Sequence, residues 1–196
     1  PVTNAKCTAS QAVSTTGTKT GCMKWYAFND EGNDKVNLLL DHNTTAFVAW
    51  ASSGTNANGP VELKVQLESD TSSWNKSINA RLIEASEIAT ITGNNGWTAG
   101  GNYYYFHDNT QTEYKGVAGT NKYAWLFDNT RGCTTYGCNV ADSSNYGYWT
   151  NNAYSGLSNL AWCVDYFGYL NRFNVRDADH YGVRPVVSVN RSIITG

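Results

Sequence analysis

The last third of the chain constrains the fold most, because short strand-like pieces alternate there with polar loops. Between residues 146 and 189 the strand-like pieces are GYWT, AWCVDYF and VRPVVSV, and the loops between them are rich in Asn, Ser, Gly and Tyr. Apolar pieces of this length, bounded by turn residues, predict short strands. The loops also carry bulky residues that loops seldom carry, namely Leu157, Leu160, Phe167, Tyr169, Arg172 and Phe173.

This loop composition is typical of a binding surface. Aromatic side chains offer a large, rigid contact area at low entropic cost, while Ser, Gly and Asn offer adaptable hydrogen bonding. Trp149 and Trp162 lie inside strand-like pieces, so we expect them to be buried scaffold. The residues that we expect at the binding surface are Tyr169, Arg172, Phe173, Arg176 and Asp177.

Length and composition indicate that residues 1–196 form one domain of the soluble type. A chain of 196 residues is long enough to bury a core, and 13% aromatic residues are too many for a disordered chain. The net charge of -2 gives no electrostatic case for binding nucleic acid. No apolar run approaches the roughly 20 residues of a membrane-spanning helix, so this sequence predicts no membrane insertion.

The five cysteines suggest local disulfides. Cys7 and Cys22 flank a Ser/Thr-rich stretch, and Cys133 and Cys138 flank Thr-Thr-Tyr-Gly. We expect two bridges, Cys7–Cys22 and Cys133–Cys138, with residues 1–21 as an arm fixed by the first bridge. This pattern indicates an oxidising compartment and therefore an extracellular or cell-surface location. The alternative is five reduced thiols in a cytosolic protein, which the polar Gly/Thr surroundings disfavour.

No metal or cofactor is predicted. The cysteine spacings match no zinc pattern, and the three histidines do not cluster with them. Because the sequence begins at Pro1, we expect a processed chain or a fragment, with any export signal or anchor ahead of residue 1.

Turn and capping signals predict the remaining elements. Pro60 suits the first position of a helix, and Gly93 suits a helix C-cap. Arg184 is expected to be a buried or half-buried ion-pair residue, and Pro185 is expected to start a strand or lie on an edge strand. A long polar loop is expected over residues 93–122. The predicted elements are strands over 22–28, 35–43 and 45–50, helices over 60–69 and 85–92, and a strand over 122–129.

Several of these segments resemble a known family. Arg81-Leu82 with the helix from Ala85 to Thr92 is similar to the Arg-Leu-Pro-Thr-x-x-Glu-Trp element of the formylglycine-generating-enzyme branch of the C-type lectin fold. The resemblance covers about residues 22 to 189 and is most specific in the last fifty residues. The segments that resemble the closing motifs of that branch are Tyr148-Trp149-Thr150, Ala161-Trp162 with Val164-Asp165, and Gly182-Val183-Arg184-Pro185-Val186.

The resemblance implies an α+β fold of the C-type lectin-like type, with small twisted antiparallel sheets, two helices and long irregular loops. The pattern recurs in bacterial surface and pilin-associated proteins and in the variable proteins of diversity-generating retroelements. In those variable proteins the altered positions lie just before the closing strand, and mutation at template adenines converts Asn codons into a mixture. The resemblance thus implies a variable ligand-binding region over residues 146–181, with candidates Asn151, Asn152, Leu157, Leu160, Cys163, Phe167, Tyr169, Arg172, Phe173, Arg176, Asp177, Asp179 and His180.

The chain also departs from its relatives in this fold. The Glu-Pro-Asn or Gln-Pro-Asp and Trp-Asn-Asp motifs of calcium-dependent lectins are absent, and the cysteine pair that performs oxidation in formylglycine-generating enzymes is not recognisable. Ca²⁺ needs six to eight oxygen ligands, so we expect no calcium-dependent sugar binding.

Three functions follow as hypotheses. The first is a binding module for a protein or glycan on another cell or surface, serving adhesion or target recognition. The second is a structural pilus or surface subunit that assembles with copies of itself. The third, ranked last, is an enzyme that acts through Cys163 or through a pair such as Asp165 and His180. We expect a binding protein and not an enzyme.

Overall fold

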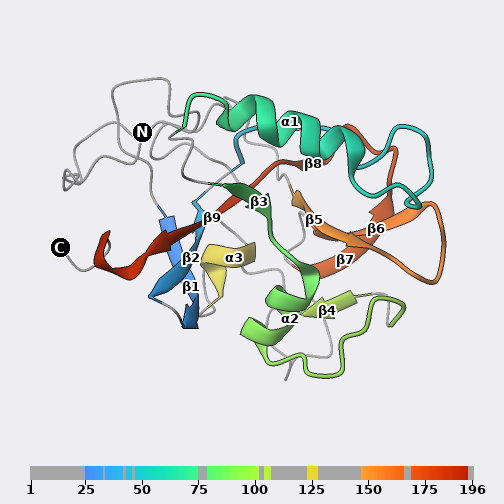
Figure 1. Cartoon of the computed structure of the whole chain (residues 1–196). Helices are drawn as coiled ribbons and strands as arrows, with labels where there is room; N and C mark the ends of the chain where they lie inside the picture. The colour runs from blue at the N-terminus through green and yellow to red at the C-terminus, as the bar shows by residue number, and fades with distance from the viewer. Residues whose placement is uncertain are drawn as a thin grey trace.

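The structure is a computed structural model that describes residues 25–32, 34–41, 43–45, 47–74, 79–101, 104–106, 123–127, 147–165 and 169–193. The described elements have an α+β architecture that combines two sheets with helices (Figure 1). In chain order they are β1 (Trp25–Gly32), β2 (Lys35–Leu40), α1 (Val61–Thr71), β3 (Ala80–Leu82), α2 (Ala85–Thr92), β4 (Tyr104–Phe106), α3 (Ala124–Phe127), β5 (Gly147–Ala153), β6 (Leu160–Val164), β7 (Tyr169–Asn174), β8 (Tyr181–Gly182), β9 (Pro185–Asn190) and a 3₁₀ turn, η1 (Arg191–Ile193). Within these residues, no helix is both long and apolar enough to cross a membrane.

The two sheets are joined by the last strands of the chain. The first sheet has the strand order β1-β2-β9-β3, and its neighbouring strands are antiparallel. The second has the order β4-β7-β6-β5-β8, in which β5 and β8 run parallel and the other pairs antiparallel. The parallel pair departs from the predicted antiparallel pattern. Because β8 belongs to one sheet and β9 to the other, the chain crosses between the sheets at Val183 and Arg184.

The predicted N-terminal hairpin is confirmed. Strands β1 and β2 pair antiparallel from Trp25 opposite Leu40 to Gly32 opposite Lys35. The first strand extends further than predicted, through the polar separator, because register irregularities accommodate the extra residues. The turn uses the left-handed backbone of Gly32 and Asp34, with φ of 70° and 60°.

Both predicted helices are confirmed. Helix α1 begins one residue later than expected, since Pro60 caps it from outside with ψ of 73°. Helix α2 has the predicted bounds, and Gly93 ends it in the left-handed conformation with φ of 75°. Glu84 and Glu87 form a capping box at its start, which satisfies backbone N–H groups that would otherwise lack partners.

Two predicted strands are wrong. The described residues of this segment, 45 and 47–50, form only an isolated bridge between Thr45 and Val183, and the Val48 N–H donates to the Tyr181 carbonyl. Within residues 122–129, the described part is the short helix α3. The apolar pattern of this segment indicates that it is buried. Its carbonyls make a tertiary contact, and this contact favours a helix over a strand.

The segment predicted as a loop over 169–174 is the strand β7, and residues 104–106 of the predicted long loop form β4. Strand β7 lies between β4 and β6, so it is an interior strand of the second sheet. Its alternation was hidden because polar residues occupy both faces: Leu170 and Arg172 are buried on one, while Tyr169, Asn171 and Phe173 point to the other.

The core lies on both faces of the second sheet. On one face, Trp162 and Tyr148 pack with Ile88 of α2 and Leu126 of α3. On the opposite face, Trp149 packs with apolar residues of α1 and of the segment before it, including Trp50, Leu63 and Leu67. Trp149 and Trp162 are both fully buried, which confirms their predicted scaffold role.

Arg184 is fully buried, but no carboxylate among the described residues forms the predicted ion pair with it. Its guanidinium donates to the carbonyls of Leu40 (2.7 Å), Asp41 (2.9 Å), Trp125 (2.7 Å) and Leu126 (3.1 Å). Burial lowers the pKa of Arg184 from its ordinary value, and the nearby Tyr148 and Asp41 oppose that shift. Pro185 begins β9, as predicted. Proline has no backbone N–H to donate, and the first position of this strand does not require one.

We expect Arg184→Met to destabilise the fold by at least about 3 kcal/mol, because four carbonyls lose their bond from the guanidinium, although the Leu126 carbonyl keeps its bond from the Tyr148 hydroxyl. Arg184→Lys should also lose about 2 kcal/mol or more, since one ammonium cannot replace a planar fork of donors. The free energy of unfolding in urea measures both. The matched control is Arg191→Met at an exposed position, with an expected change within about 0.5 kcal/mol. Equal effects at the two positions would contradict the role given to Arg184.

Candidate functional site

Three loops meet at one end of the molecule, and we call residues 52–59, 155–159 and 174–180 the loop cluster. Figure 1 shows the three segments together, next to the N-terminal end of α1. Backbone bonds join them: Asn56 N–H to the Ser158 carbonyl (2.6 Å), Val175 N–H to the Asn159 carbonyl (3.0 Å), and Ala51 N–H to the Val175 carbonyl (2.9 Å). The loops therefore form one hydrogen-bonded unit.

Asn56 is the anchor of the loop cluster. Its side-chain amide donates to the carbonyls of Tyr154 (2.9 Å), Leu157 (3.1 Å) and Leu160 (2.7 Å). These bonds close the β5–β6 hairpin loop on itself and against the first loop. Leu157, at the tip, is 53% exposed, although it is a large apolar residue. The exposed leucine is thus presented by a fixed backbone.

The third loop is shaped by Asp177. Its carboxylate accepts the backbone N–H groups of Asp179 and His180, each at 3.0 Å, and lies 3.0 Å from the His180 ring nitrogen Nδ1. The exposed His180 ring also contacts the rings of Phe173 and Tyr181. Arg176 donates to the Ser53 carbonyl at 3.0 Å while its side chain remains exposed. Of the predicted residues, Leu157, Arg176, Asp177, Asp179 and His180 thus belong to the loop cluster.

Phe173 lies beside the loop cluster, near the last residue of β7, whereas Tyr169 lies at the other end of that strand. Both are half-buried, and alternation places them on the same face of the second sheet as Asn171. Phe173 packs against Tyr181 with ring centroids 5.1 Å apart. Leu160, at the first position of β6, is also half-buried. Phe173 and Leu160 therefore offer part of their surface next to the cluster, and Tyr169 does not.

Arg172 requires a correction, because it does not reach the predicted surface. It is 9% exposed and points to the opposite face of β7. Its guanidinium lies 4.0 Å from the centre of the Tyr154 ring, a cation–π contact. Arg172 therefore packs under the hairpin loop.

Cys163 requires the same correction. Its thiol is fully buried in β6, in the core cluster with Trp149 and Tyr181. Burial, and secondarily the negative charge of Asp165, raises the pKa of Cys163 well above its ordinary value. The reactive thiolate is disfavoured, and a ligand at the surface cannot touch this side chain in the folded state.

The suggested pairing of Asp165 with His180 is also wrong. Asp165 is buried and accepts a bond from the Asn171 amide at 2.9 Å, whereas the carboxylate beside His180 is that of Asp177. Among the described residues, no group of three or more His, Cys, Asp or Glu side chains could hold a metal ion.

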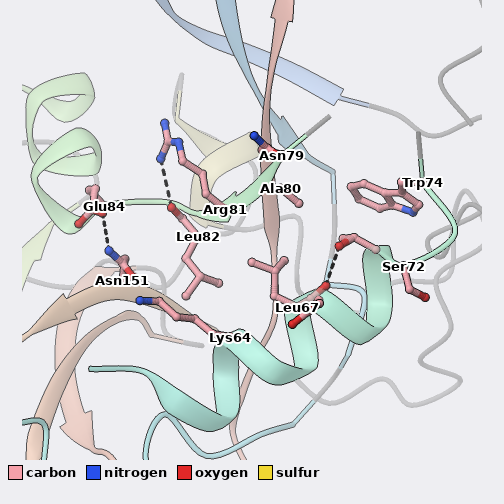
Figure 2. A pocket seen from close by; sticks show the side chains of 12 residues that line it. Lys64, Leu67, Ser72, Trp74, Asn79, Ala80, Arg81, Leu82, Glu84 and Asn151 are labelled. Atoms are coloured by element: carbon pink, nitrogen blue, oxygen red, sulfur yellow. Dashed lines mark hydrogen bonds between the residues drawn. The ribbon is translucent and has the colours of Figure 1, made fainter. Parts of the chain in front are cut away.

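Asn151 and Asn152 connect β5 to helix α2. The Asn151 amide donates to Glu84 Oε1 at 2.6 Å, and the Asn152 side-chain oxygen accepts the Ala85 N–H at 2.5 Å. Both side chains therefore support the start of α2, and Asn151 also lines a pocket (Figure 2). Phe167 and the four cysteines Cys7, Cys22, Cys133 and Cys138 lie outside the described residues.

Sequence reasoning missed the first loop of the cluster and its anchor. Residues 51–60 read ASSGTNANGP, a composition that marks a loop, and Asn56 has the amide needed to bridge several carbonyls. No local pattern pairs this loop with residues 155–159, about a hundred positions further along the chain. The sequence therefore indicates a loop at these residues, but it does not indicate which other loop this one contacts.

Asn56→Ala should cost about 1–3 kcal/mol of stability, because three carbonyls lose their bond from the Asn56 amide, although those of Leu157 and Leu160 keep a backbone donor. Amide hydrogen exchange in residues 155–160 should accelerate more than exchange in α2. Asn56→Asp, which keeps the size but removes the donors, should loosen the same loop at least as much. The control is Asn58→Ala, at an exposed position of the same loop. Unchanged exchange over 155–160 in both Asn56 variants would show that this anchor does not hold the hairpin loop.

The buried Cys163 thiol should resist alkylation. With iodoacetamide at pH 8, we expect labelling at least about a hundredfold slower than that of a free thiol, because the raised pKa and burial both withhold the thiolate. Peptide mass mapping in native buffer and in denaturant measures the rate at this position alone. Leu157→Cys is the exposed control and should label rapidly. Rapid native labelling of Cys163 would restore the hypothesis of a reactive cysteine.

Comparison with known proteins gave no match among family models, curated proteins or solved structures. The function of this chain is therefore inferred from the geometry of the loop cluster and its neighbouring residues.

Proposed function

We propose that this chain is a surface-exposed ligand-binding domain of the C-type lectin-like type, which recognises a protein or glycan target through the loop cluster. The location implied is extracellular or on a cell surface, and the role is adhesion or target recognition. The proposal assigns no catalytic residue and no cofactor.

One observation carries the proposal: bulky and charged side chains project from loops whose backbones are fixed by hydrogen bonds. Leu157 and Arg176 come from loops that are bonded to residues 52–59. Fixed loops lower the entropy lost on binding, so more of the contact energy remains as affinity. Arginine and aromatic side chains are also enriched among the residues that dominate binding energies.

The neighbouring side chains extend this surface. His180 is half exposed, at 47% of its side chain, and Phe173 lies against it with ring centroids 6.2 Å apart. These two rings form an aromatic patch, and Leu157 adds an exposed apolar side chain from the loop that is bonded to the third loop at Asn159, so apolar and polar groups alternate as in the usual anatomy of a recognition site. Either a protein surface or the apolar face of a sugar would fit such a composition.

The proposal extends to diversification by a retroelement. Exposed positions such as Leu157, Asp179 and His180 can change with little effect on the fold, because they make few buried contacts. Cys163 is fully buried, and Arg172 packs under the hairpin loop. Neither residue can therefore be changed without affecting the fold. A reverse-transcriptase gene and a near-identical template copy beside the gene would support this extension, with differences confined to the exposed positions.

The test is a comparison of matched triple variants on arrays of glycans and of cell-surface proteins. Leu157→Ser, Arg176→Ala and His180→Ala together should weaken binding to any captured target by at least about tenfold, since each removes a candidate anchor. Binding is measured with the fluorescently labelled domain, and the melting temperature confirms folding.

The control triple variant changes the outer face of α1, with Val61→Ser, Val65→Ser and Ser69→Ala, all at exposed positions. It should bind like the unaltered chain. Equal binding by both triple variants, or an equal loss in both, would rule out the loop cluster as the recognition surface. Concentration-dependent sedimentation without any captured target would instead favour the structural subunit.

A further inference from the structure

The guanidinium of Arg176 lies directly against the backbone of Gly54, in space that only a glycine leaves open. A Cβ atom on Gly54 would come within 2.3 Å of Arg176 Nε and 2.5 Å of its Cζ, closer than real Cβ contacts come. Gly54 also has a left-handed backbone with φ of 82°, which favours glycine for a second reason. Position 54 therefore turns the first loop and at the same time makes room for the arginine.

A hydrogen bond fixes the guanidinium in this position. Its Nη2 donates to the carbonyl of Ser53 at 3.0 Å. Among the described residues, no carboxylate forms an ion pair with Arg176. The neighbouring Asp177 does not draw the guanidinium away, because its carboxylate accepts the backbone N–H groups of Asp179 and His180. The guanidinium is therefore bonded to the first loop, although the side chain is exposed. We call this contact with residues 53 and 54 the arginine latch.

The arginine latch lies where the third loop leaves the other two loops. Just before it, backbone bonds of Val175 join the third loop to both of them. Just after it, the turn from Asp177 to His180 is closed on itself by the Asp177 carboxylate. At the far end of the turn, the Gly147 N–H donates to the His180 carbonyl at 3.0 Å. The direction in which the turn leaves the first loop is therefore set at Arg176.

This turn carries side chains of the recognition surface. Asp179 and His180 are exposed on it. The His180 ring contacts the rings of Phe173 and Tyr181, with centroids 6.2 Å and 6.3 Å apart. Because both exposed residues follow the arginine latch in the chain, a change of backbone at that point would move them relative to the first loop. The arrangement of the recognition surface thus depends on a contact that is not itself a target contact.

We propose that Arg176 is a positioning residue of the recognition surface, which fixes the orientation of the turn carrying Asp179 and His180 by resting on Gly54. Its role in recognition rests on the proposed function, whereas the arginine latch does not. One consequence is that position 176, although exposed, is not free to vary. Its partner Gly54 lies outside the predicted variable region, so diversification would keep an arginine opposite the glycine.

The experiment measures exchange of the backbone amides of Asp179 and His180 by NMR, in the ¹⁵N-labelled chain without a ligand. Arg176→Ala should accelerate it about three- to tenfold, since a hydrogen bond from a charged group is lost. Gly54→Ala should have a similar effect although it keeps the arginine, because the added Cβ displaces the guanidinium. The double variant should stay within about twofold of Arg176→Ala alone, because both changes remove the same contact.

Gly59→Ala is the matched control. Gly59 has a similar left-handed backbone, with φ of 75°, but a Cβ atom there would meet nothing within 4 Å. The substitution therefore adds the backbone strain without moving the guanidinium. Amide exchange at Asp179 and His180 should stay within about twofold of that in the unaltered chain.

A second readout separates positioning from general stabilisation. The ring proton signals of His180, identified by their loss in His180→Ala, report its contacts with the two neighbouring aromatic rings. These signals should shift in Arg176→Ala and in Gly54→Ala, and they should stay in place in Gly59→Ala. A residue that only stabilises the fold would lower the melting temperature and leave these signals where they are.

Four results would overturn the proposal. Unchanged exchange in Arg176→Ala, or effects of the two substitutions that simply add, would show that the guanidinium does not hold the turn through Gly54. Equal acceleration in helix α2 would indicate a general loss of stability, and unmoved His180 ring signals would leave Arg176 with a structural role alone. Since none of these measurements uses a target, failure here is distinguishable from failure of the proposed function.

Discussion

The buried guanidinium of Arg184 is the contact on which the two sheets depend. It lies where the chain leaves β8 and enters β9, and it donates to carbonyls at the end of β2 and in α3. Leu40 and Asp41 lie at the end of β2, while Trp125 and Leu126 belong to α3. Burying a charge is costly unless its donors are used, so the four bonds both compensate the arginine and fix three segments relative to one another.

The core on either side follows from this crossing. Tyr148 of β5 lies under Arg184, with the guanidinium 5.0 Å from its ring centre, and donates to the same Leu126 carbonyl at 2.8 Å. Trp149, the next residue, points to the opposite face, where it donates to the Val48 carbonyl at 2.8 Å. Two adjacent residues of one strand therefore connect α3 and the segment before α1 to the same sheet.

Local signals predicted the elements that local chemistry determines. The bounds of α2 followed from Gly93 and its apolar spacing, and the hairpin followed from the polar separator before Lys35. Prediction failed where a distant partner decides the outcome. The carbonyls of helix α3 accept bonds from Arg184, which lies almost sixty positions away in the sequence. Strand β7 was not recognised, because its polar residue Arg172 is buried against Tyr154. The same limit applies to the site, where two of the three loops of the cluster were predicted but the loop that holds them was not.

Some of the predicted binding residues lie at the surface and others lie in the core. This division determines which positions such a domain could alter to change its specificity. Leu157 is exposed, yet its backbone is fixed by Asn56, which lies outside the predicted variable region. Since Asn56 contacts carbonyls and not side chains, its bonds do not depend on which side chain occupies an exposed position such as 157, whereas a side chain at Gly156 would collide with the Tyr154 ring. Anchoring by backbone atoms thus separates the stability of the scaffold from the identity of the exposed residues. Under the proposed function, a loop could then be altered without losing the rigidity on which its affinity depends.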